Sequence, residues 1–260
     1  MTEATIKLTY DGPTAIITLD RPERRNAISL QMMDEIVEAC TRLDADNAVR
    51  TVIISGGETC FSSGADLTEA LTVKTAADGR KFFGSLRRLN AAVDSLSKPV
   101  IAAIEGFCMT GGCELALACD LRVAGAGATF GITSARIGTI AGAGGTQRLP
   151  RVVGLSNALA MLFSADPIDA DEAFRIGLIN RKTDKGGALD AARAIASTYA
   201  ERAPLSLALT KKAVRQGMSM PLEQGFDLEM SLVSAIYGTQ DKQEGISAFL
   251  EKRKPTFIGR

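Results

Sequence analysis

Histidine is absent from this 260-residue chain, and that absence excludes more chemistry than any other feature of the composition. A Ser-His-Asp or Cys-His catalytic group cannot be built without it, and the commonest protein ligand of zinc is missing as well. The five cysteines form no C-x-x-C pair, and we interpret them as small buried hydrophobic residues. Acid–base chemistry must therefore depend mainly on Asp, Glu, Lys, Tyr or backbone dipoles.

The sequence also lacks an excess of one charge, a long apolar run and a signal-peptide pattern. Lys and Arg together number 30 and are balanced by 30 Asp and Glu, so we expect neither nucleic acid nor a membrane as a partner. No apolar run approaches the ~20 residues that span a bilayer. The first residues do not follow the basic-then-apolar order of a signal peptide. These absences predict a cytoplasmic protein.

The length and the 46% content of hydrophobic residues suit one folded unit with a sizeable core. In the first half, short β-type runs alternate with helical stretches, which is typical of parallel βαβ units. After about residue 150 nearly every segment has helical spacing. The expected strands are 14–19, 49–55, 99–104 and 121–124, and the expected helices are 30–43, 82–96, 112–119, 155–164, 169–176, 187–202, 204–216, 221–236 and 239–253.

Three glycine-rich segments, 60–67, 104–115 and 138–149, need an explanation. They do not form a P-loop or a dinucleotide fingerprint, because the required Lys and the third glycine are missing. In the middle segment a buried strand runs into a helix, where glycines let a ligand approach the free N–H groups of the first helical turn. That arrangement suits a developing oxyanion. Glu114 on the same turn is then either a base or simply an acidic residue at a helix N-terminus.

Five motifs occur in an order that spans nearly the whole chain. They are Arg21-Pro-Glu-Arg-Arg-Asn-Ala27, Phe61-Ser-Ser-Gly-Ala-Asp-Leu67, Gly106-Phe-Cys-Met-Thr-Gly-Gly-Cys-Glu-Leu-Ala-Leu-Ala-Cys-Asp120, Gly142-Ala-Gly-Gly-Thr-Gln-Arg-Leu149 and Phe249-Leu-Glu-Lys-Arg-Lys254. Together they resemble the crotonase superfamily, and within it the enoyl-CoA hydratase/isomerase family. The resemblance implies an α/β fold: a crotonase-like spiral of βαβ units over residues 1–190, then a helical lid and trimerisation region over 191–260. It also implies a homotrimer or a homohexamer.

The same resemblance implies roles for individual residues. The backbone N–H groups of Ala65 and Gly111 match the two donors that hold a thioester oxygen as it becomes an enolate, and Glu114 matches the glutamate that activates water. Six positions match a coenzyme A site: Arg25, Ala27, Asp66, Leu67, Phe249 and Lys252. In the family the last two often reach the adenine and phosphates from a neighbouring subunit. For Lys252 plain solvation within the run Lys-Arg-Lys is the alternative.

Three positions depart from the family pattern, and one of them is Ala141, which stands where the family usually has proline before Gly142. The second glutamate of hydratases falls on Ser134, whose hydroxyl is too weak an acid to protonate the α-carbon but can position a water molecule. Thr110 replaces the first residue of the usual Ala/Gly triplet. The resemblance implies hydration of a 2-enoyl-CoA thioester, with coenzyme A carried by the substrate and without a metal or redox cofactor. The alternatives are enoyl-CoA isomerisation, thioester hydrolysis, or acyl-CoA binding with little catalysis.

Overall fold

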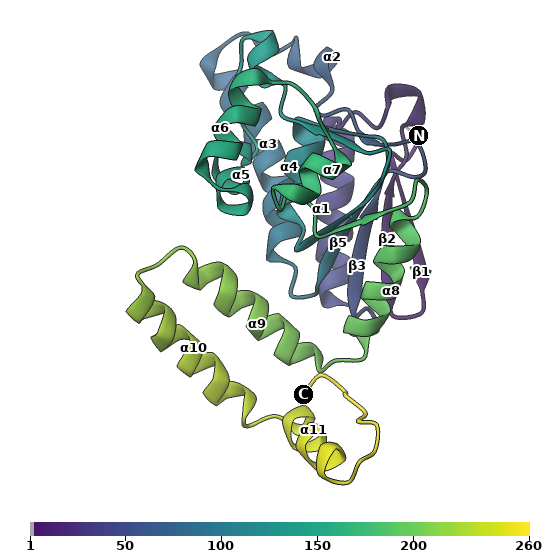
Figure 1. The fold of residues 1–260 in the computed structure, drawn as a ribbon, viewed down its shortest axis with the longest axis vertical. Coiled ribbons are helices and arrows are strands. Elements are labelled where there is room, and N and C mark those ends of the chain that lie inside the picture. The colour runs from purple at the N-terminus through teal and green to yellow at the C-terminus, as the bar shows by residue number, and fades with distance from the viewer. Residues whose placement is uncertain (1–2) are drawn as a thin grey trace.

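A computed structural model describes residues 3–260, and its N-terminal part is an α/β body built on two sheets (Figure 1). In the larger sheet β1 and β2 form an antiparallel hairpin, and the other neighbours are parallel. The order of its six strands is β1 (Ile6–Asp11), β2 (Thr14–Leu19), β3 (Thr51–Ser55), β5 (Val100–Ile104), β7 (Leu121–Gly125) and β10 (Arg181–Thr183).

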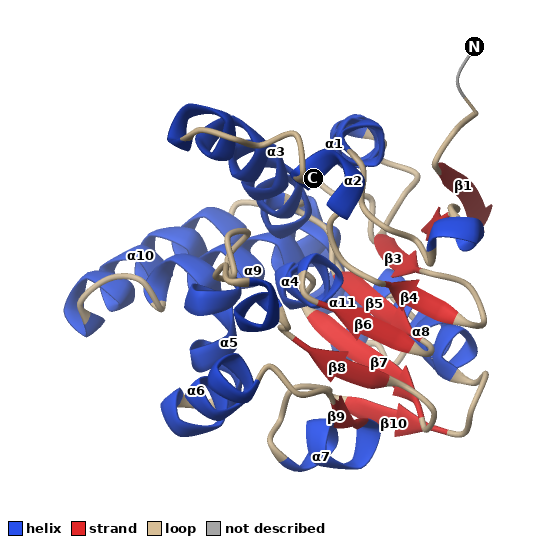
Figure 2. Cartoon of the chain, turned by 90° about the horizontal axis from the view of Figure 1, so that it is seen from above, coloured by secondary structure: helices blue, strands red, loops and turns tan. Residues whose placement is uncertain are grey.

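The smaller sheet lies beside the larger one and consists of very short strands (Figure 2). Its order is β4 (Cys60–Ser62), β6 (Phe107–Met109), β8 (Thr129–Gly131) and β9 (Ile168–Asp169). The first three are parallel, and β9 runs antiparallel to β8. Since β3, β5 and β7 are each followed within a few residues by β4, β6 and β8, the chain crosses repeatedly from one sheet to the other and forms a spiral.

Helices cover both faces of the larger sheet, and local signals explain where several of them begin. The body contains α1 (Leu30–Ala45), α2 (Leu67–Ala70), α3 (Ala76–Ser95), α4 (Gly111–Ala118), α5 (Gly145–Val153), α6 (Leu155–Ser164), α7 (Ala170–Arg175) and α8 (Ala188–Ala200), with short 3₁₀ helices η1 (Pro22–Arg24) and η2 (Ser134–Ile137). The Ser29 hydroxyl caps α1, and Thr75 with Asp78 forms a capping box at the start of α3.

The central strands are buried on both faces, which explains their continuous apolar sequence. On one face Ile53 and Ile101 pack in a small cluster against the alanines of α8, and the remaining buried residues form the main core with α1, α3 and α4. α8 crosses the boundary expected at residue 190 and packs on the sheet. No helix within residues 3–260 is both long and apolar enough to cross a membrane.

Three helices extend away from the body at the bottom of Figure 1. They are α9 (Pro204–Gly217), α10 (Leu222–Ile236) and α11 (Gln240–Leu250), and we call them the C-terminal arm. Neither α9 nor α10 contains a buried residue. Large apolar side chains are therefore exposed along the arm, among them Val214, Met218, Leu222, Phe226, Met230, Val233, Tyr237 and Phe249. An apolar surface of this extent is typical of a contact with another molecule.

Charged side chains hold α9 against the body. Lys211 Nζ lies 2.9 Å from Asp120 Oδ2, and an Arg215 nitrogen lies 2.7 Å from Asp120 Oδ1. Arg215 also pairs with Asp94 of α3, and Asp94 Oδ2 lies 3.3 Å from an Arg148 nitrogen of α5. A continuous network of ion pairs thus joins the C-terminal arm to the helices around α4.

Candidate active site

The three loops that carry the predicted centre leave neighbouring strands of the smaller sheet. Ala65 follows β4, Gly111 follows β6, and Ser134 follows β8. These strands are parallel and adjacent in the order β4-β6-β8 (Figure 2). The carboxyl ends of parallel strands meet at one edge of a sheet, which is where open α/β proteins bind ligands. The topology therefore collects these three positions at one edge.

The two predicted oxyanion donors lie close together. A β-carbon added to Gly111 would lie only 3.0 Å from the Ala65 nitrogen, and one added to Gly64 would lie 3.3 Å from the Gly111 nitrogen. Gly111 is the first residue of α4, whose first-turn N–H groups have no partner inside the helix. Within residues 3–260 neither amide donates a hydrogen bond. Two free donors at this separation provide the pair that a developing oxyanion requires.

The backbone around Ala65 is held by the segment that contains Arg25 and Ala27. The Ile28 amide donates to the Gly64 carbonyl at 2.8 Å, and the Asp66 amide donates to the Ile28 carbonyl at 3.0 Å. Arg25 has an exposed side chain and a left-handed backbone with φ of 50°. These bonds join the predicted coenzyme A segment directly to the first oxyanion donor.

Asn26, which sequence reasoning did not single out, is buried and connects the segment around Arg25 and Ala27 to the chain that leads to Ala65. Its side chain is buried, and its Nδ2 donates to the carbonyls of Gly56 at 2.9 Å and Cys60 at 2.8 Å. Its own carbonyl accepts a hydrogen bond of 2.8 Å from the Ser62 hydroxyl. The signal available in the sequence is the place of Asn26 inside the first of the five motifs, residues 21–27.

Asp66 and Leu67, both predicted to lie near coenzyme A, have different surroundings. The Asp66 carboxylate is buried, lies 3.1 Å from Arg21 and accepts from the Thr68 amide at 2.9 Å, so that it caps α2. Burial by itself raises the pKa of Asp66, but the hydrogen bonds from Arg21 and Thr68 leave that pKa below its ordinary value. Leu67 is 58% exposed. Only Leu67 therefore has its side chain free for a ligand.

The other two predicted coenzyme A residues lie far from this centre within one chain. Phe249 belongs to α11 and is 82% exposed, and Lys252 follows that helix with φ of 55°. Figure 1 places α11 at the bottom of the molecule, α2 at the top, and α4 within the body between them. A single chain does not bring Phe249 or Lys252 together with Ala65, Gly111 and Glu114.

Glu114 is buried and its carboxylate points toward the turn before α5. Oε1 accepts hydrogen bonds of 2.8 Å from the amides of both Ala143 and Gly145. Burial raises the pKa of Glu114, and these two N–H groups together with the Arg148 charge act in the opposite direction. A β-carbon on Gly145 would lie 3.0 Å from Oε1, so glycine lets the turn approach the carboxylate. A buried carboxylate with a raised pKa suits general-base catalysis better than a solvated helix end does.

The turn that holds Glu114 is itself fixed by two residues that sequence reasoning missed. Asn90 is 1% exposed on α3, and its Nδ2 donates to the Ala143 carbonyl at 2.8 Å. An Arg148 nitrogen lies 3.4 Å from the same carbonyl. Asn90 occupies a core-facing position of an amphipathic helix, where a polar residue is unusual, and that was the available signal. Asn90 and Arg148 thus fix the turn whose Ala143 and Gly145 amides bind the Glu114 carboxylate.

The loop after β8 contributes hydroxyl groups at the position where the family resemblance leads us to expect a carboxylate. Ser134 is buried at the start of η2, and its hydroxyl makes no hydrogen bond within residues 3–260. The preceding residue, Thr133, contacts Thr110 through paired hydroxyls 2.9 Å apart. Arg136 is exposed and pairs with Asp166, so it faces the surface.

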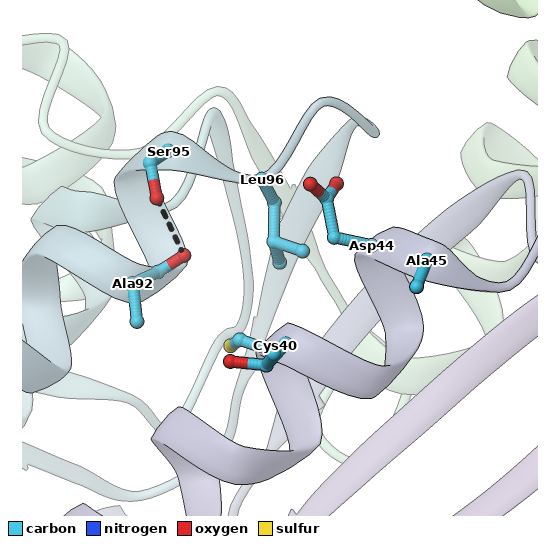
Figure 3. A pocket seen from close by; sticks show the side chains of 7 residues that line it. Cys40, Asp44, Ala45, Ala92, Ser95 and Leu96 are labelled. Carbon is cyan, nitrogen blue, oxygen red and sulfur yellow. Dashed lines mark hydrogen bonds between the residues drawn. The ribbon is translucent and has the colours of Figure 1, made fainter.

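A separate hollow of about 320 Å³ lies between the C-terminal ends of α1 and α3, as Figure 3 shows. Its one nucleophilic group of note is the thiol of Cys40, near the carboxylate of Asp44. Burial, reinforced by Asp44, raises the pKa of Cys40 to about 12, so the thiol stays protonated and unreactive. This hollow is not a second reactive centre.

Comparisons with known proteins show which family this chain resembles along its length. The family model described as enoyl-CoA hydratase/isomerase matches residues 11–260. A crotonyl-CoA hydratase from Syntrophomonas wolfei is 38% identical over 256 residues, which cover 98% of each chain. A 2,3-dehydroadipyl-CoA hydratase from Escherichia coli is 38% identical over 245 residues, covering 94% of this chain and 95% of the other.

Solved structures show the same architecture. The crystal structure of an enoyl-CoA hydratase from Bacillus anthracis has a TM-score of 0.94 and 34% identity, covering 98% of this chain and 100% of that one. A second enoyl-CoA hydratase structure, from Geobacillus kaustophilus, has a TM-score of 0.92 and 35% identity over 98% of each chain. These matches confirm the predicted crotonase-like α/β fold with C-terminal helices. The chain belongs to the enoyl-CoA hydratase/isomerase family.

Proposed function

We propose that this protein adds water to the double bond of a 2-enoyl-CoA thioester. The observation that carries the proposal is the buried Glu114 carboxylate on the same helical turn as the free Gly111 amide, with the Ala65 amide beside it. This arrangement supplies a base and an oxyanion hole within one small volume.

In the proposed reaction the thioester oxygen accepts hydrogen bonds from the amides of Ala65 and Gly111. Oε1 of Glu114 is occupied by two backbone N–H groups, so Oε2 takes the proton from water. The water oxygen bonds to the β-carbon, the double-bond electrons move onto the thioester oxygen as an enolate, and the proton held by Glu114 then passes to the α-carbon. Oxidation of the β-carbon, which gains a C–O bond, is balanced by reduction of the α-carbon, which gains a C–H bond, so the proposed reaction needs no redox cofactor.

The proposal is restricted to the enoyl thioester, which the named relatives share. Relatives named for crotonyl-CoA and for 2,3-dehydroadipyl-CoA are equally similar to this chain, at 38% identity. The two acyl groups differ in length and charge. We therefore propose the substrate class and leave the acyl group to a chain-length series.

The test is the loss of ultraviolet absorbance of the conjugated thioester when purified protein is mixed with crotonyl-CoA. We expect steady loss with the parent protein and 3-hydroxyacyl-CoA as the product. Tight binding of a saturated acyl-CoA without any loss of absorbance would refute short-chain hydration and favour a binding role.

Isomerisation is the second candidate, because the single carboxylate, Glu114, could move a proton between the α- and γ-carbons while Ser134 takes no part. A 3-enoyl-CoA substrate separates the two reactions. An isomerase converts it to the conjugated 2-enoyl-CoA, and absorbance rises. A hydratase leaves it unchanged.

Replacing Ser134 by Glu is expected to increase the kcat for hydration by about tenfold or more, because a carboxyl group can deliver the α-proton that serine cannot. The measurement is the crotonyl-CoA assay on a variant whose thermal unfolding matches the parent. Ser134→Gln is the matched control, since it adds the same bulk without an ionisable proton. An equal gain with Gln, or no gain with Glu, would show that proton delivery at this position does not limit the rate.

Replacing Arg148 by Gln is expected to move the acid limb of the kcat/KM profile to higher pH. The proposed base must be ionised, and Arg148 is a positive charge that lowers the pKa of Glu114 against the effect of burial. Removing that charge leaves the pKa of Glu114 higher still, so activity is lost at a higher pH. Arg148→Lys should keep the limb near its parent position, and Arg175→Gln, on the exposed surface of α7, should not move it.

We propose that copies of the chain assemble into a homotrimer or a homohexamer through the C-terminal arm. The exposed apolar side chains of α9 and α10 support this, because neither helix buries a residue within one chain. Assembly would also supply a neighbour's Phe249 and Lys252 to the coenzyme A site. The expected mass in sedimentation equilibrium is three or six times 27.4 kDa.

We propose the cytoplasm as the location. All five cysteines are free and buried, which fits a compartment that keeps thiols reduced. Besides other copies of the chain, the proposed reaction needs no partner except the acyl-CoA substrate, and we propose none among nucleic acids or membranes.

A further inference from the structure

Thr110, the residue before the second predicted oxyanion donor, has a backbone conformation that residues other than glycine rarely adopt. Thr110 has φ of 42° and ψ of −108°, although it is β-branched. Unfavourable backbone geometry of this kind persists only where the surroundings hold it, and it is concentrated at functional sites. The ψ angle of Thr110 also rotates the peptide plane between residues 110 and 111. It therefore sets the direction in which the Gly111 N–H points.

Three contacts hold Thr110 in this conformation. The Thr110 amide donates to the Gly131 carbonyl at 2.7 Å. The Thr110 Oγ1 lies 2.9 Å from the Thr133 Oγ1 and also accepts a hydrogen bond of 3.2 Å from the Thr133 amide. The Thr110 carbonyl accepts the Glu114 amide at 2.9 Å. The rotation of Thr110 is thus fixed from both sides, by the loop after β8 and by the first turn of α4.

The Thr110 side chain also reaches the loop of the first donor. A β-carbon added to Gly64 would lie 3.3 Å from the Thr110 Cβ. The Thr110 side chain therefore lies between the loop that contains Ala65 and the loop that contains Thr133. The Thr110 carbonyl belongs to the same peptide group as the Gly111 N–H. A shift of Thr110 changes the angle between the two oxyanion donors.

We propose that the hydroxyl pair of Thr110 and Thr133 is a positioning device for the oxyanion hole. The pair directs the Gly111 N–H toward the same oxygen position as the Ala65 N–H. Neither threonine contacts the substrate itself. The inference rests on the proposed thioester chemistry, because alignment of the donors matters only if an oxyanion forms. A purely structural role for the pair would affect unfolding but not the polarisation of a bound carbonyl.

The test uses Thr110→Val and Thr133→Val, each of which removes one hydroxyl and preserves the branched shape. Thr110→Ser is the conservative variant, because it keeps the hydroxyl and loses only the methyl group. The probe is dimethylaminocinnamoyl-CoA, whose absorption moves to longer wavelength when its carbonyl oxygen receives strong hydrogen bonds. We expect both Val variants to lose a large part of this shift and about 10- to 100-fold in kcat for crotonyl-CoA, with KM within about threefold. Thr110→Ser should retain the shift and a kcat within about threefold of the parent.

The double Val variant should be no worse than Thr110→Val alone, because removing the Thr110 hydroxyl already removes both its contact with the Thr133 hydroxyl and its bond from the Thr133 amide. A full absorption shift and parent kcat in both folded Val variants would overturn the proposal. If a Val variant fails to unfold cooperatively, Thr110→Gly replaces it, since glycine accepts the backbone conformation without the tether and should also lose the shift. A parent protein that shifts the probe but turns over no enoyl-CoA refutes the hydratase proposal alone. A parent that binds the probe without any shift refutes the positioning proposal, and it refutes the hydratase proposal as well if the same protein turns over no crotonyl-CoA.

Discussion

Replacing Glu114 by Gln is expected to lower the kcat for crotonyl-CoA hydration by about 10²- to 10⁴-fold, the usual contribution of a general base. The Gln carbonyl can still accept the Ala143 and Gly145 amides that now bind Oε1, so the fold around the turn is preserved. Affinity for a saturated acyl-CoA should stay within a few-fold. The measurements are the absorbance assay and titration with butyryl-CoA.

Glu105→Gln is a matched control for this variant. Glu105 is also a buried glutamate, but its Oε1 accepts the Ala188 amide at 3.0 Å at the start of α8, away from the oxyanion donors. We expect its activity to remain close to that of the parent. A fully active Glu114→Gln protein would remove Glu114 from the mechanism, whatever the behaviour of the control.

Replacing Gly111 by Ala is expected to reduce kcat/KM by about 10²- to 10³-fold, which is the effect of losing one oxyanion donor. The added carbon would lie 3.0 Å from the Ala65 nitrogen, which is the separation that a bound oxygen needs from its donor. The methyl group must therefore displace either the substrate oxygen or the Ala65 loop. Steady-state kinetics with crotonyl-CoA gives the loss.

Gly84→Ala provides the comparison for Gly111→Ala. Gly84 also lies in a helix, α3, but a β-carbon there would meet no atom within 4 Å. This variant should keep parent kinetics and should be slightly more stable, since alanine favours helix. Parent kcat/KM in folded Gly111→Ala would mean that the Gly111 amide does not receive the thioester oxygen.

The four inner strands of the larger sheet, β2, β3, β5 and β7, and most helices could be predicted, because each is long enough to show an apolar run or a helical period. The two edge strands, β1 and β10, were not predicted. β2 occupies the expected residues, and the expected helix at 30–43 is extended by only two residues in α1. The smaller sheet could not be predicted, because β4, β6 and β8 have three residues each and no period can be read from so few. α5 was missed for another reason, since it begins with Gly145 and contains Pro150, both of which usually end helices.

The candidate site was predictable where its chemistry belongs to a continuous motif. Ala65, Gly111 and Glu114 stand in two such motifs, and parallel strands bring the motifs to one edge. For Asn90 the sequence offered only a polar residue on the core face of a helix, and its partner could not be predicted, because the carbonyl of Ala143 lies 53 residues away. Pairing of Thr110 with Thr133 had no signal, since only β6 and β8 lying side by side reveals it.

The ion pairs around α9 give the proposed base, Glu114, a chemical link to the proposed assembly of subunits through the C-terminal arm. Asp94 is shared between Arg215 of the C-terminal arm and Arg148, whose charge acts on Glu114. A displacement of the arm would take Arg215 away from the Asp94 carboxylate that Arg148 also contacts, and would thereby alter the charge that acts on Glu114. Linkage is reciprocal, so protonation of Glu114 must alter the free energy of docking the arm by the same amount. Subunit association should therefore take up or release protons, and its equilibrium constant should vary with pH across the titration of Glu114.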